Sequence, residues 1–193
     1  MTRVGVLAFQ GDVREHLATL SEVGVTGVPV KTLAELQSVD GLILPGGEST
    51  TIAKLSRIFG LFDPIKDAIA AGLPTFGTCA GLILLADKIL DGIEGQETFG
   101  GLDVVVRRNA FGHQTESFEI DLEFRGIEGA PLTAAFIRAP IIESLGNSAE
   151  ALATLPDGRV VAVRQQNILG ISFHPEVTDE PRVHELFVRE FIG

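Results

Sequence analysis

Several residue types are scarce or missing in this sequence of 193 residues, which contains one cysteine, one methionine, and neither tryptophan nor tyrosine. A single cysteine cannot form an internal disulfide, so nothing points to an oxidising compartment. The first residues lack the long apolar stretch and the small-residue cleavage site of a signal peptide. No apolar run approaches the ~20 residues that a membrane-spanning helix needs. We therefore expect a cytoplasmic protein with no membrane association.

Basic residues are also in deficit, with 15 Lys and Arg against 26 Asp and Glu, a formal net charge of -11 and a sequence pI near 4.7. A negative molecule repels nucleic-acid phosphates and anionic lipid surfaces, so we expect no nucleic-acid partner. Hydrophobic residues make up 45% of the chain, which is typical of a globular protein with an ordinary core. No linker or internal repeat is visible, and we predict a single domain, residues 1–193.

The first half of the chain alternates short apolar runs with helical patterns. Residues 4–9 form an apolar run that predicts a buried strand, and Asp12 then looks like the N-cap of a helix. Similar strands are predicted at residues 41–44 and 75–77, the second followed by a helix over residues 80–86. This alternation predicts an α/β fold with a largely parallel sheet. Ligands of such sheets bind at the carboxyl ends of the strands, where Gln10, Gly46, Gly47 and Cys79 all fall.

The second half has a different pattern. Residues 118–124 alternate apolar and acidic side chains, which indicates an antiparallel strand with one face in water. Further short strands are predicted at residues 133–137, 160–164 and 168–173, and a closing helix that begins at Pro181 and runs to Phe191. The sheet is therefore expected to be mixed.

The segment Phe-Gly-Thr-Cys-Ala-Gly at residues 76–81 places Cys79 on a glycine-flanked turn between a buried strand and a helix. This arrangement is typical of a nucleophile elbow. The free N–H groups and positive dipole of the helix start favour a thiolate. A lone cysteine is otherwise more often an inert, buried small side chain, and a redox-sensing thiol is a further alternative.

His174 and Glu176 supply the groups that such a nucleophile needs. In a strand, residues two apart project to the same side with Cα atoms about 6.5–7 Å apart, so these side chains can meet. The carboxylate can then hold one ring nitrogen while the other faces the thiol, which is the logic of a catalytic triad. Taken singly, His174 is equally a loop-end residue and Glu176 a surface charge or helix cap. We expect no metal site, because the other histidines show no ligand-like spacing with Cys79: His16, His113 and His184.

A Pro-Gly-Gly turn at residues 45–47 follows another predicted strand. Its backbone N–H groups and that of Ala80 are candidates for an oxyanion hole, in which one donor is typically worth about 3–4 kcal/mol. A phosphate-binding turn or a plain tight turn has the same appearance. The sequence has neither a lysine after the glycines, as in a Walker motif, nor a G-x-G-x-x-G segment, which disfavours nucleotide binding.

The Pro-Gly-Gly turn, the segment around Cys79 and the His174–Glu176 segment follow one another along the chain, and in this combination the chain resembles the class I, or triad, glutamine amidotransferases. Other segments are similar to the glutaminase subunits of pyridoxal 5′-phosphate synthases. They are Leu-Ile-Leu-Pro-Gly-Gly-Glu-Ser-Thr-Thr at residues 42–51, Arg-Asn-Ala-Phe-Gly at 108–112 and Phe-Ile-Arg-Ala-Pro at 136–140. The likeness extends over essentially the whole chain.

The resemblance implies a three-layer, flavodoxin-like α/β fold with a mixed, mostly parallel sheet and helices on both faces. It also implies hydrolysis of L-glutamine to L-glutamate and ammonia, with no cofactor. Cys79 would attack the side-chain amide carbon, His174 would move the proton and Glu176 would orient His174. Water would then cleave the glutamyl thioester.

The same resemblance assigns binding residues by motif. Backbone groups at Gly46, Gly47 and Ala80 would form the oxyanion hole, with Gln10 near that turn. The glutamine site would comprise Gly47, Glu48, Ser49, Arg108, Ile137 and Arg138. Groups of both signs suit the α-ammonium and α-carboxylate of glutamine, and which arginine meets the carboxylate stays open. Taken singly, either arginine is equally a surface residue, and Glu48 equally a helix-start charge. The chain departs from the family at His113, where relatives usually carry a second basic residue.

The resemblance further implies a partner, a (β/α)₈-barrel pyridoxal 5′-phosphate synthase subunit that receives the ammonia through a tunnel. The glutaminase would be weak alone and activated by docking. Two alternatives stay open. One is a triad glutaminase that serves another acceptor, as in histidine, purine or anthranilate synthesis. The other is a non-catalytic redox or binding module on the same fold.

Overall fold

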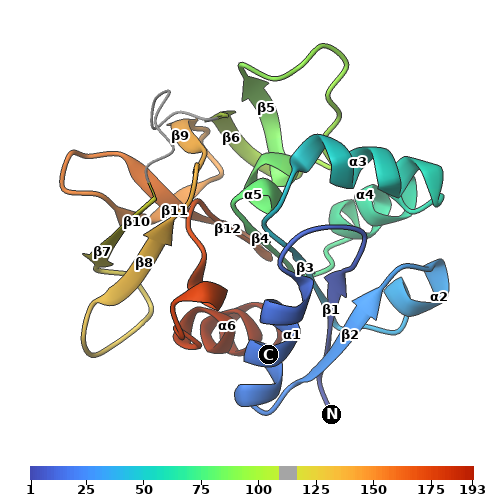
Figure 1. The fold of residues 1–193 in the computed structure, drawn as a ribbon, viewed down its shortest axis with the longest axis horizontal. Helices are drawn as coiled ribbons and strands as arrows, with labels where there is room; N and C mark the ends of the chain where they lie inside the picture. Colours follow the sequence, from blue (N-terminus) through green and yellow to red (C-terminus); the bar gives the residue numbers. More distant parts are fainter. Residues whose placement is uncertain (109–116) are drawn as a thin grey trace.

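A ten-stranded mixed sheet forms the centre of the molecule in the computed structural model, which describes residues 1–108 and 117–193 (Figure 1). One half of the sheet is parallel, and its neighbouring strands run in the order β2 (Thr26–Val30), β1 (Arg3–Leu7), β3 (Gly41–Leu44), β4 (Thr75–Thr78) and β12 (Ile168–Ile171). The last three of these strands are buried along their whole length, which explains why they appear in the sequence as uninterrupted runs without charge.

The other half of the sheet is mainly antiparallel. It continues from β12 through β11 (Val160–Gln165), β9 (Ile141–Leu145), β6 (Leu102–Arg107) and β5 (Ala86–Leu90), and β10 (Glu150–Thr154) also pairs with β11. Only β5 and β6 are parallel to each other in this half. Two further strands, β7 (Phe118–Leu122) and β8 (Leu132–Phe136), form a separate antiparallel pair.

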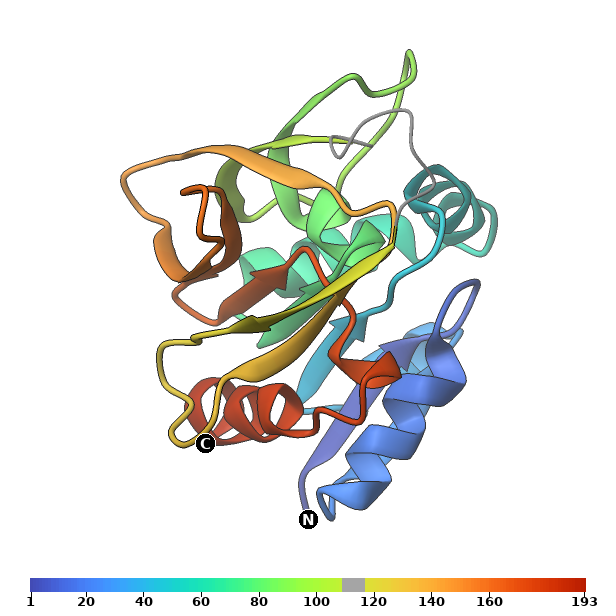
Figure 2. The same ribbon diagram turned by 60° about the vertical axis from the view of Figure 1, so that its left-hand side comes forward.

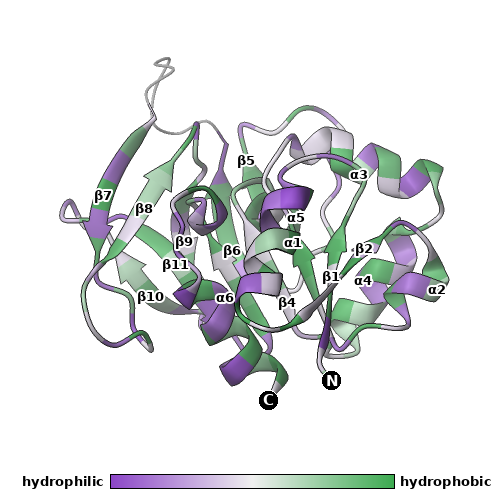
Figure 3. Cartoon of the chain, turned by 60° about the horizontal axis from the view of Figure 1, so that its bottom comes forward, coloured by the Kyte–Doolittle hydropathy of each residue, from purple (hydrophilic) through white to green (hydrophobic). Residues whose placement is uncertain are grey.

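Helices cover both faces of the sheet and produce three layers (Figure 2). One hydrophobic cluster packs the sheet against α2 (Leu33–Leu36), α3 (Ser49–Ile58), α4 (Phe62–Ala70) and α5 (Ala80–Leu85). The cluster on the opposite face involves α1 (Val13–Glu22), α6 (Arg182–Phe187), its π-helical extension Val188–Ile192 and the β7–β8 pair. The central strands are mostly hydrophobic, whereas α3, α4 and α6 alternate hydrophobic and hydrophilic residues along their length (Figure 3). None of the helices in the described ranges is long and apolar enough to cross a membrane.

The predicted α/β fold with a mixed, mostly parallel sheet and helices on both faces is confirmed. The antiparallel pairing predicted for residues 118–124 is also confirmed, although β7 ends at Leu122 and lies outside the main sheet. Five strands of the described ranges were not anticipated, namely β2, β5, β6, β9 and β10. Each has charged or exposed residues interrupting its apolar pattern, so no clean alternation marks it in the sequence.

Two local predictions were wrong. The strand predicted over residues 168–173 ends at Ile171, and residues Pro175–Val177 form a 3-10 helix rather than continuing in extended geometry. Pro175 at the start of this turn suits a helix, because its fixed φ is helical and the missing N–H is not needed there. Asp12 does stand directly before α1, but its side chain makes no capping hydrogen bond.

Candidate active site

Cys79 occupies a strained turn between β4 and α5. Its φ of 48° lies in the left-handed region, which a residue with a Cβ adopts only under constraint. Its N–H donates to the carbonyl of Ile171 on β12 at 2.9 Å. A Cβ on Gly77 would lie 2.6 Å from the carbonyl of Gly81, and one on Gly81 would lie 2.0 Å from the carbonyl of Leu44. The two glycines are therefore required for the close packing that forms the predicted elbow.

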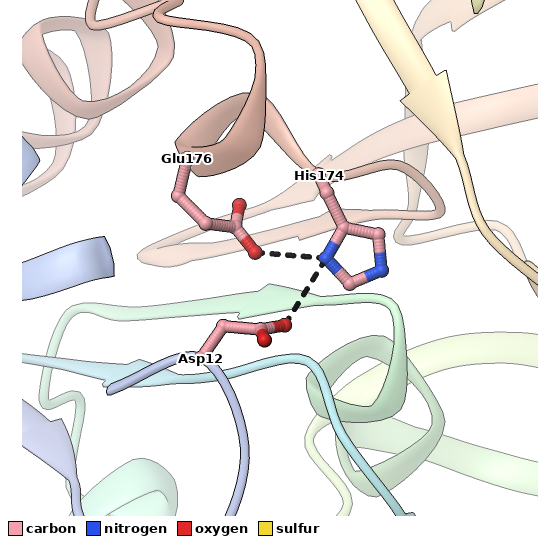
Figure 4. Close-up of side chains that lie close together, drawn as sticks. All are labelled: Asp12, His174 and Glu176. Atoms are coloured by element: carbon pink, nitrogen blue, oxygen red, sulfur yellow. Dashed lines mark hydrogen bonds and ion pairs between the residues drawn. The ribbon is translucent and has the colours of Figure 1, made fainter. Parts of the chain in front are cut away.

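His174 lies just beyond β12 and reaches the same edge of the sheet. Its N–H donates to the carbonyl of Ala135 on β8 at 2.9 Å, which anchors its backbone. Its Nδ1 is 2.8 Å from Oε1 of Glu176 (Figure 4). The expected contact between the two side chains is thus present, but the 3-10 turn at Pro175 produces it, not the strand spacing assumed from the sequence.

Three neighbours determine the charge of the His174 ring. Burial lowers the pKa of this imidazole, but hydrogen bonds with Asp12, Cys79 and Glu176 outweigh burial and raise the pKa from 6.5 to about 12. The ring is therefore an imidazolium at neutral pH, beside the sulfur of Cys79. Burial raises the pKa of the Glu176 carboxyl, and the hydrogen bond with His174 opposes that rise. The arrangement suits a thiolate–imidazolium pair that Glu176 orients.

Asp12 also contacts the His174 ring, although the sequence indicated only a role in helix capping for it. Its Oδ2 lies 3.4 Å from Nδ1 of His174, the same nitrogen that meets Glu176 (Figure 4). Asp12, His174 and Glu176 also offer three potential metal-ligand atoms within 4.8 Å of one another. The contacts to Nδ1 account for this clustering without an ion.

The Pro-Gly-Gly turn packs tightly against the loop that follows β1. The N–H of Asp12 donates to the carbonyl of Gly46 at 3.1 Å, and the N–H of Glu48 donates to Oε1 of Gln10 at 2.7 Å. A Cβ on Gly46 would lie 2.3 Å from Cε1 of His174, so the ring rests directly on this glycine. Gly47 has a φ of 147°, and a Cβ there would meet Gln10. The turn therefore contacts both the His174 ring and the side chain of Gln10.

Glu48 has two roles in this structure. Its Oε2 accepts hydrogen bonds from the N–H groups of Thr50 and Thr51 and caps α3, while Oε1 pairs with Nη2 of Arg108 at 2.7 Å. Partial burial raises the pKa of Glu48, but these hydrogen bonds and the charge of Arg108 lower it overall. Gln96 was not predicted, and it links the site by accepting from Arg108 at 2.8 Å and donating to Ser49 at 3.0 Å.

These side chains surround one cavity of about 510 Å³ at the carboxyl ends of β1, β3 and β4. Most of the predicted site residues line it: Gln10, Gly47, Glu48, Ser49, Cys79, Ala80, Arg108, Ile137, Arg138 and His174. Glu176 lies behind the His174 ring, and Gly46 lies beneath it. Asp12, Ile83 and Val177 complete the lining. His113 falls outside the described residues, as do positions 109–112 of the motif that begins at Arg108.

Comparisons with known proteins identify the family of this chain. The SNO glutamine amidotransferase family matches residues 6–193. The chain belongs to this family. It is 59% identical, over 99% of its length and 96% of the relative's, to the pyridoxal 5′-phosphate synthase subunit PdxT of Leifsonia xyli subsp. xyli. The PdxT of Streptomyces coelicolor is 58% identical over 95% of this chain and 91% of its own.

Solved structures also resemble this member of the SNO family. A crystal structure described as a glutamine amidotransferase has a TM-score of 0.90 and 47% identity, covering 96% of this chain and 97% of its own. A Thermoplasma acidophilum protein described as a GMP synthase component has a TM-score of 0.68 at 19% identity, over 98% and 93% of the two chains, and supports the fold alone. The resemblance predicted from the sequence is therefore confirmed at the level of family and fold.

Behind Glu176, this SNO-family chain contains a buried histidine pair, which the sequence had offered only as histidines without metal-ligand spacing. Nδ1 of His16 on α1 lies 2.8 Å from Nε2 of His184 on α6, and Nε2 of His16 lies 3.2 Å from Oγ1 of Thr78 and 3.5 Å from Oε1 of Glu176. Burial lowers the pKa of His184 to about 3, and burial together with the neighbouring histidines lowers that of His16. Both rings are therefore neutral at physiological pH. In the sequence, the burial of His16 was indicated only by its position next to Leu17 on α1, a helix whose apolar side chains pack against the sheet.

Proposed function

We propose that this chain is the glutaminase subunit of a pyridoxal 5′-phosphate synthase, and that it hydrolyses L-glutamine to L-glutamate and ammonia with Cys79, His174 and Glu176. The observation that carries the proposal is that the elbow cysteine, the imidazolium and the carboxylate meet at one end of a cavity lined by charges of both signs. The description of the matching family as glutamine amidotransferases supports the reaction, and the names of the PdxT relatives support its place in pyridoxal 5′-phosphate (vitamin B6) synthesis.

The reaction begins when the thiolate of Cys79 attacks the side-chain amide carbon of glutamine. The carbonyl oxygen becomes an oxyanion, which N–H groups of Gly47 and Ala80 stabilise, with Gly46 shaping the turn. The imidazolium of His174 then gives its proton to the leaving nitrogen, and ammonia departs as the C–N bond breaks. A glutamyl thioester remains on Cys79.

The second half of the reaction releases glutamate. His174, now neutral, takes a proton from water as the water oxygen attacks the thioester carbon. The C–S bond breaks, the thiolate returns and His174 is again an imidazolium. Glu176 holds Nδ1 throughout, so that Nε2 is the nitrogen that exchanges protons with substrate, as in other triads.

The rest of the cavity recognises the two charged ends of glutamine. Arg108 and Arg138 are the candidates for its α-carboxylate, and Glu48 is the candidate for its α-ammonium. Ser49 and Ile137 complete the glutamine site. Glu48 and Gln96 already hold the guanidinium of Arg108 in place, which reduces the conformational entropy lost when substrate binds.

The ammonia passes to a synthase partner, which we propose to be a (β/α)₈ barrel. The reaction requires Cys79 as a free thiol, which suits the reducing cytoplasm. A glutaminase for another acceptor is disfavoured by the PdxT names at 54–59% identity over nearly the full chain. A redox module is disfavoured because a sensor thiol does not need the His174–Glu176 pair.

The test compares the wild-type chain with Cys79→Ala, each mixed with a pyridoxal 5′-phosphate synthase barrel. Wild type is expected to release ammonia from glutamine and support product formation, whereas Cys79→Ala should lose glutamine-dependent turnover because the covalent step has no nucleophile. Ammonium chloride should restore product formation in the Cys79→Ala complex, which controls for folding and partner binding. Glutamine turnover by the variant, or a wild-type complex that makes product only from ammonium, would contradict the proposal.

A further inference from the structure

The carboxylate of Asp12 has no role in its own helix. Asp12 occupies the position directly before α1, where aspartate side chains usually accept a hydrogen bond from the first turn, yet its side chain makes no such bond. The carboxylate turns instead toward the cavity, where its Oδ2 lies 3.4 Å from Nδ1 of His174. Because the Asp12 side chain lacks the usual capping hydrogen bond, we infer that its contact with His174 determines its orientation.

Asp12 also contacts the glycine turn with both its backbone and its side chain. Its N–H donates to the carbonyl of Gly46, and a Cβ on Gly46 would lie 2.7 Å from Oδ2 and 2.3 Å from Cε1 of His174. The Asp12 carboxylate and the His174 imidazole therefore both pack directly against Gly46, next to each other. No larger residue at that position leaves room for this contact.

His174 consequently faces two carboxylates through one nitrogen. Glu176 is fully buried and accepts at 2.8 Å, which is the distance of a direct hydrogen bond. The side chain of Asp12 is 35% exposed at the cavity, and its Oδ2 lies 3.4 Å from the same nitrogen, a longer contact than that of Glu176. The other groups packed around the ring are Cys79 at the elbow and, through Glu176, the neutral His16 on α1. Glu48, Arg108 and Arg138 line the same cavity.

We propose that Asp12 is a positioning residue of the glutaminase reaction, acting through His174 to hold the ring in its charged form and in contact with the Gly46 turn. This inference rests on the proposed function for its catalytic consequence, but the Asp12–His174 interaction exists independently of substrate. The hydrogen bond between Asp12 and His174 also contributes to the raised pKa of the ring. Glu176 provides the orientation, and Asp12 adds negative charge that stabilises the imidazolium paired with the thiolate.

The decisive variant is Asp12→Asn, which keeps the size of the side chain and the backbone N–H but removes the charge. The matched control is Glu15→Gln, which also removes one negative charge close to the start of α1. Glu15 pairs with Arg14 and does not line the cavity. Asp12→Glu tests rescue by a restored carboxylate. Asp12→Ser provides a second neutral variant should Asp12→Asn fail to fold.

The first measurement is the titration of the His174 ring by NMR in the full-length chain, in a Cys79→Ala background that brings the midpoint closer to neutral pH. An opposite charge within ~4–6 Å shifts a pKa by roughly 1–3 units, and partial exposure of Asp12 places the effect near the lower end. Asp12→Asn should therefore lower the midpoint by about one pH unit. Glu15→Gln should leave it unchanged, and Asp12→Glu should recover part of the loss. Coincident midpoints for Asp12→Asn and its parent overturn the proposal.

The second measurement is the pH profile of ammonia release by the complex with the synthase barrel. Because the imidazolium is the acid for ammonia departure, the alkaline limb of kcat/KM should move to lower pH in Asp12→Asn by a similar amount, with kcat falling and KM nearly constant. A raised KM with an unchanged profile overturns the proposal and assigns Asp12 to substrate contact. A wild-type complex inactive on glutamine refutes the proposed function, whereas the NMR titration still decides the Asp12–His174 interaction.

Discussion

The buried histidine pair leads to a quantitative prediction about acid stability. His184 is 0% exposed, and its Nε2 is the atom that meets His16. Since His16 points Nε2 toward Thr78 and the Glu176 carboxylate, its Nδ1 is an acceptor and His184 donates to it. The substitution His184→Gln places an amide N–H near the position of Nε2. It keeps the donor and removes the group that titrates.

The size of the effect follows from the difference between the folded and unfolded states. In the folded protein burial lowers the pKa of His184 to about 3, whereas an exposed imidazole titrates near 6.5. Between pH 7.5 and 5.5 the unfolded chain therefore takes up a proton that the folded chain does not, and the free energy of unfolding falls as the pH falls. One such histidine accounts for about 1.4 kcal/mol over this interval. His16 contributes in the same direction, because its folded pKa is also lowered.

His174 acts in the opposite direction. Its pKa is raised in the folded state, so the stability it contributes is fully present below pH 6.5 and decreases as the pH rises above that value. The total pH dependence of the wild type is thus a sum of opposing contributions. The difference between wild type and His184→Gln isolates one of them.

Urea unfolding of both proteins at a series of pH values from 7.5 to 5.5 measures this difference. Wild type should lose about 1.4 kcal/mol more than His184→Gln over the interval, with similar denaturant slopes. The result that refutes the reasoning is a parallel decline in the two proteins, because it means that His184 is protonated in the folded state or exposed to solvent there.

Two further predictions concern the turn and the cavity. Gly46→Ala places a Cβ 2.3 Å from Cε1 of His174, so the ring must move, and a displacement of ~1 Å is expected to lower ammonia release about 100-fold in the complex; activity near that of wild type contradicts the contact. Glu48→Gln keeps an oxygen for capping α3 but loses the pairing with Arg108. It should cost about 0.5–1 kcal/mol in urea unfolding and raise KM for glutamine, and an unchanged KM argues against a role of this pair in binding.

Much of the candidate site was predictable because its members carry local signals. Glycines on both sides of Cys79 indicate a turn that tolerates no bulk, and the structure shows why, since Cβ atoms on Gly77 or Gly81 would collide with backbone. The apolar runs before Gln10, Gly46 and Cys79 mark three buried parallel strands, whose carboxyl ends necessarily meet at one edge of the sheet. Gln10, Gly46 and Cys79 are therefore close together because the strands before them are parallel neighbours in the sheet.

Other contacts had no local signal. The sequence placed Asp12 at a helix start, and only packing against Gly46 turned its carboxylate toward His174. Gln96 reaches Ser49 and Arg108 from a segment without a strong pattern. The contact between His174 and Glu176 was predicted from strand spacing. In the structure a 3-10 helix that starts at Pro175 brings the two side chains together instead.

The sequence by itself indicated the α/β class, the buried strands β1, β3 and β4, the elbow at Cys79 and the candidate triad, because each depends on neighbours a few residues away or on strand order. Only the tertiary structure decided the electrostatic environment of His174. The partners of His174 and Glu176 include Asp12 and His16, which lie some 160 residues earlier in the chain, and His184 contacts His16 across a separation of 168 residues. Such separations leave no periodic pattern, and the pKa of a buried group depends on which charges and dipoles the fold places around it.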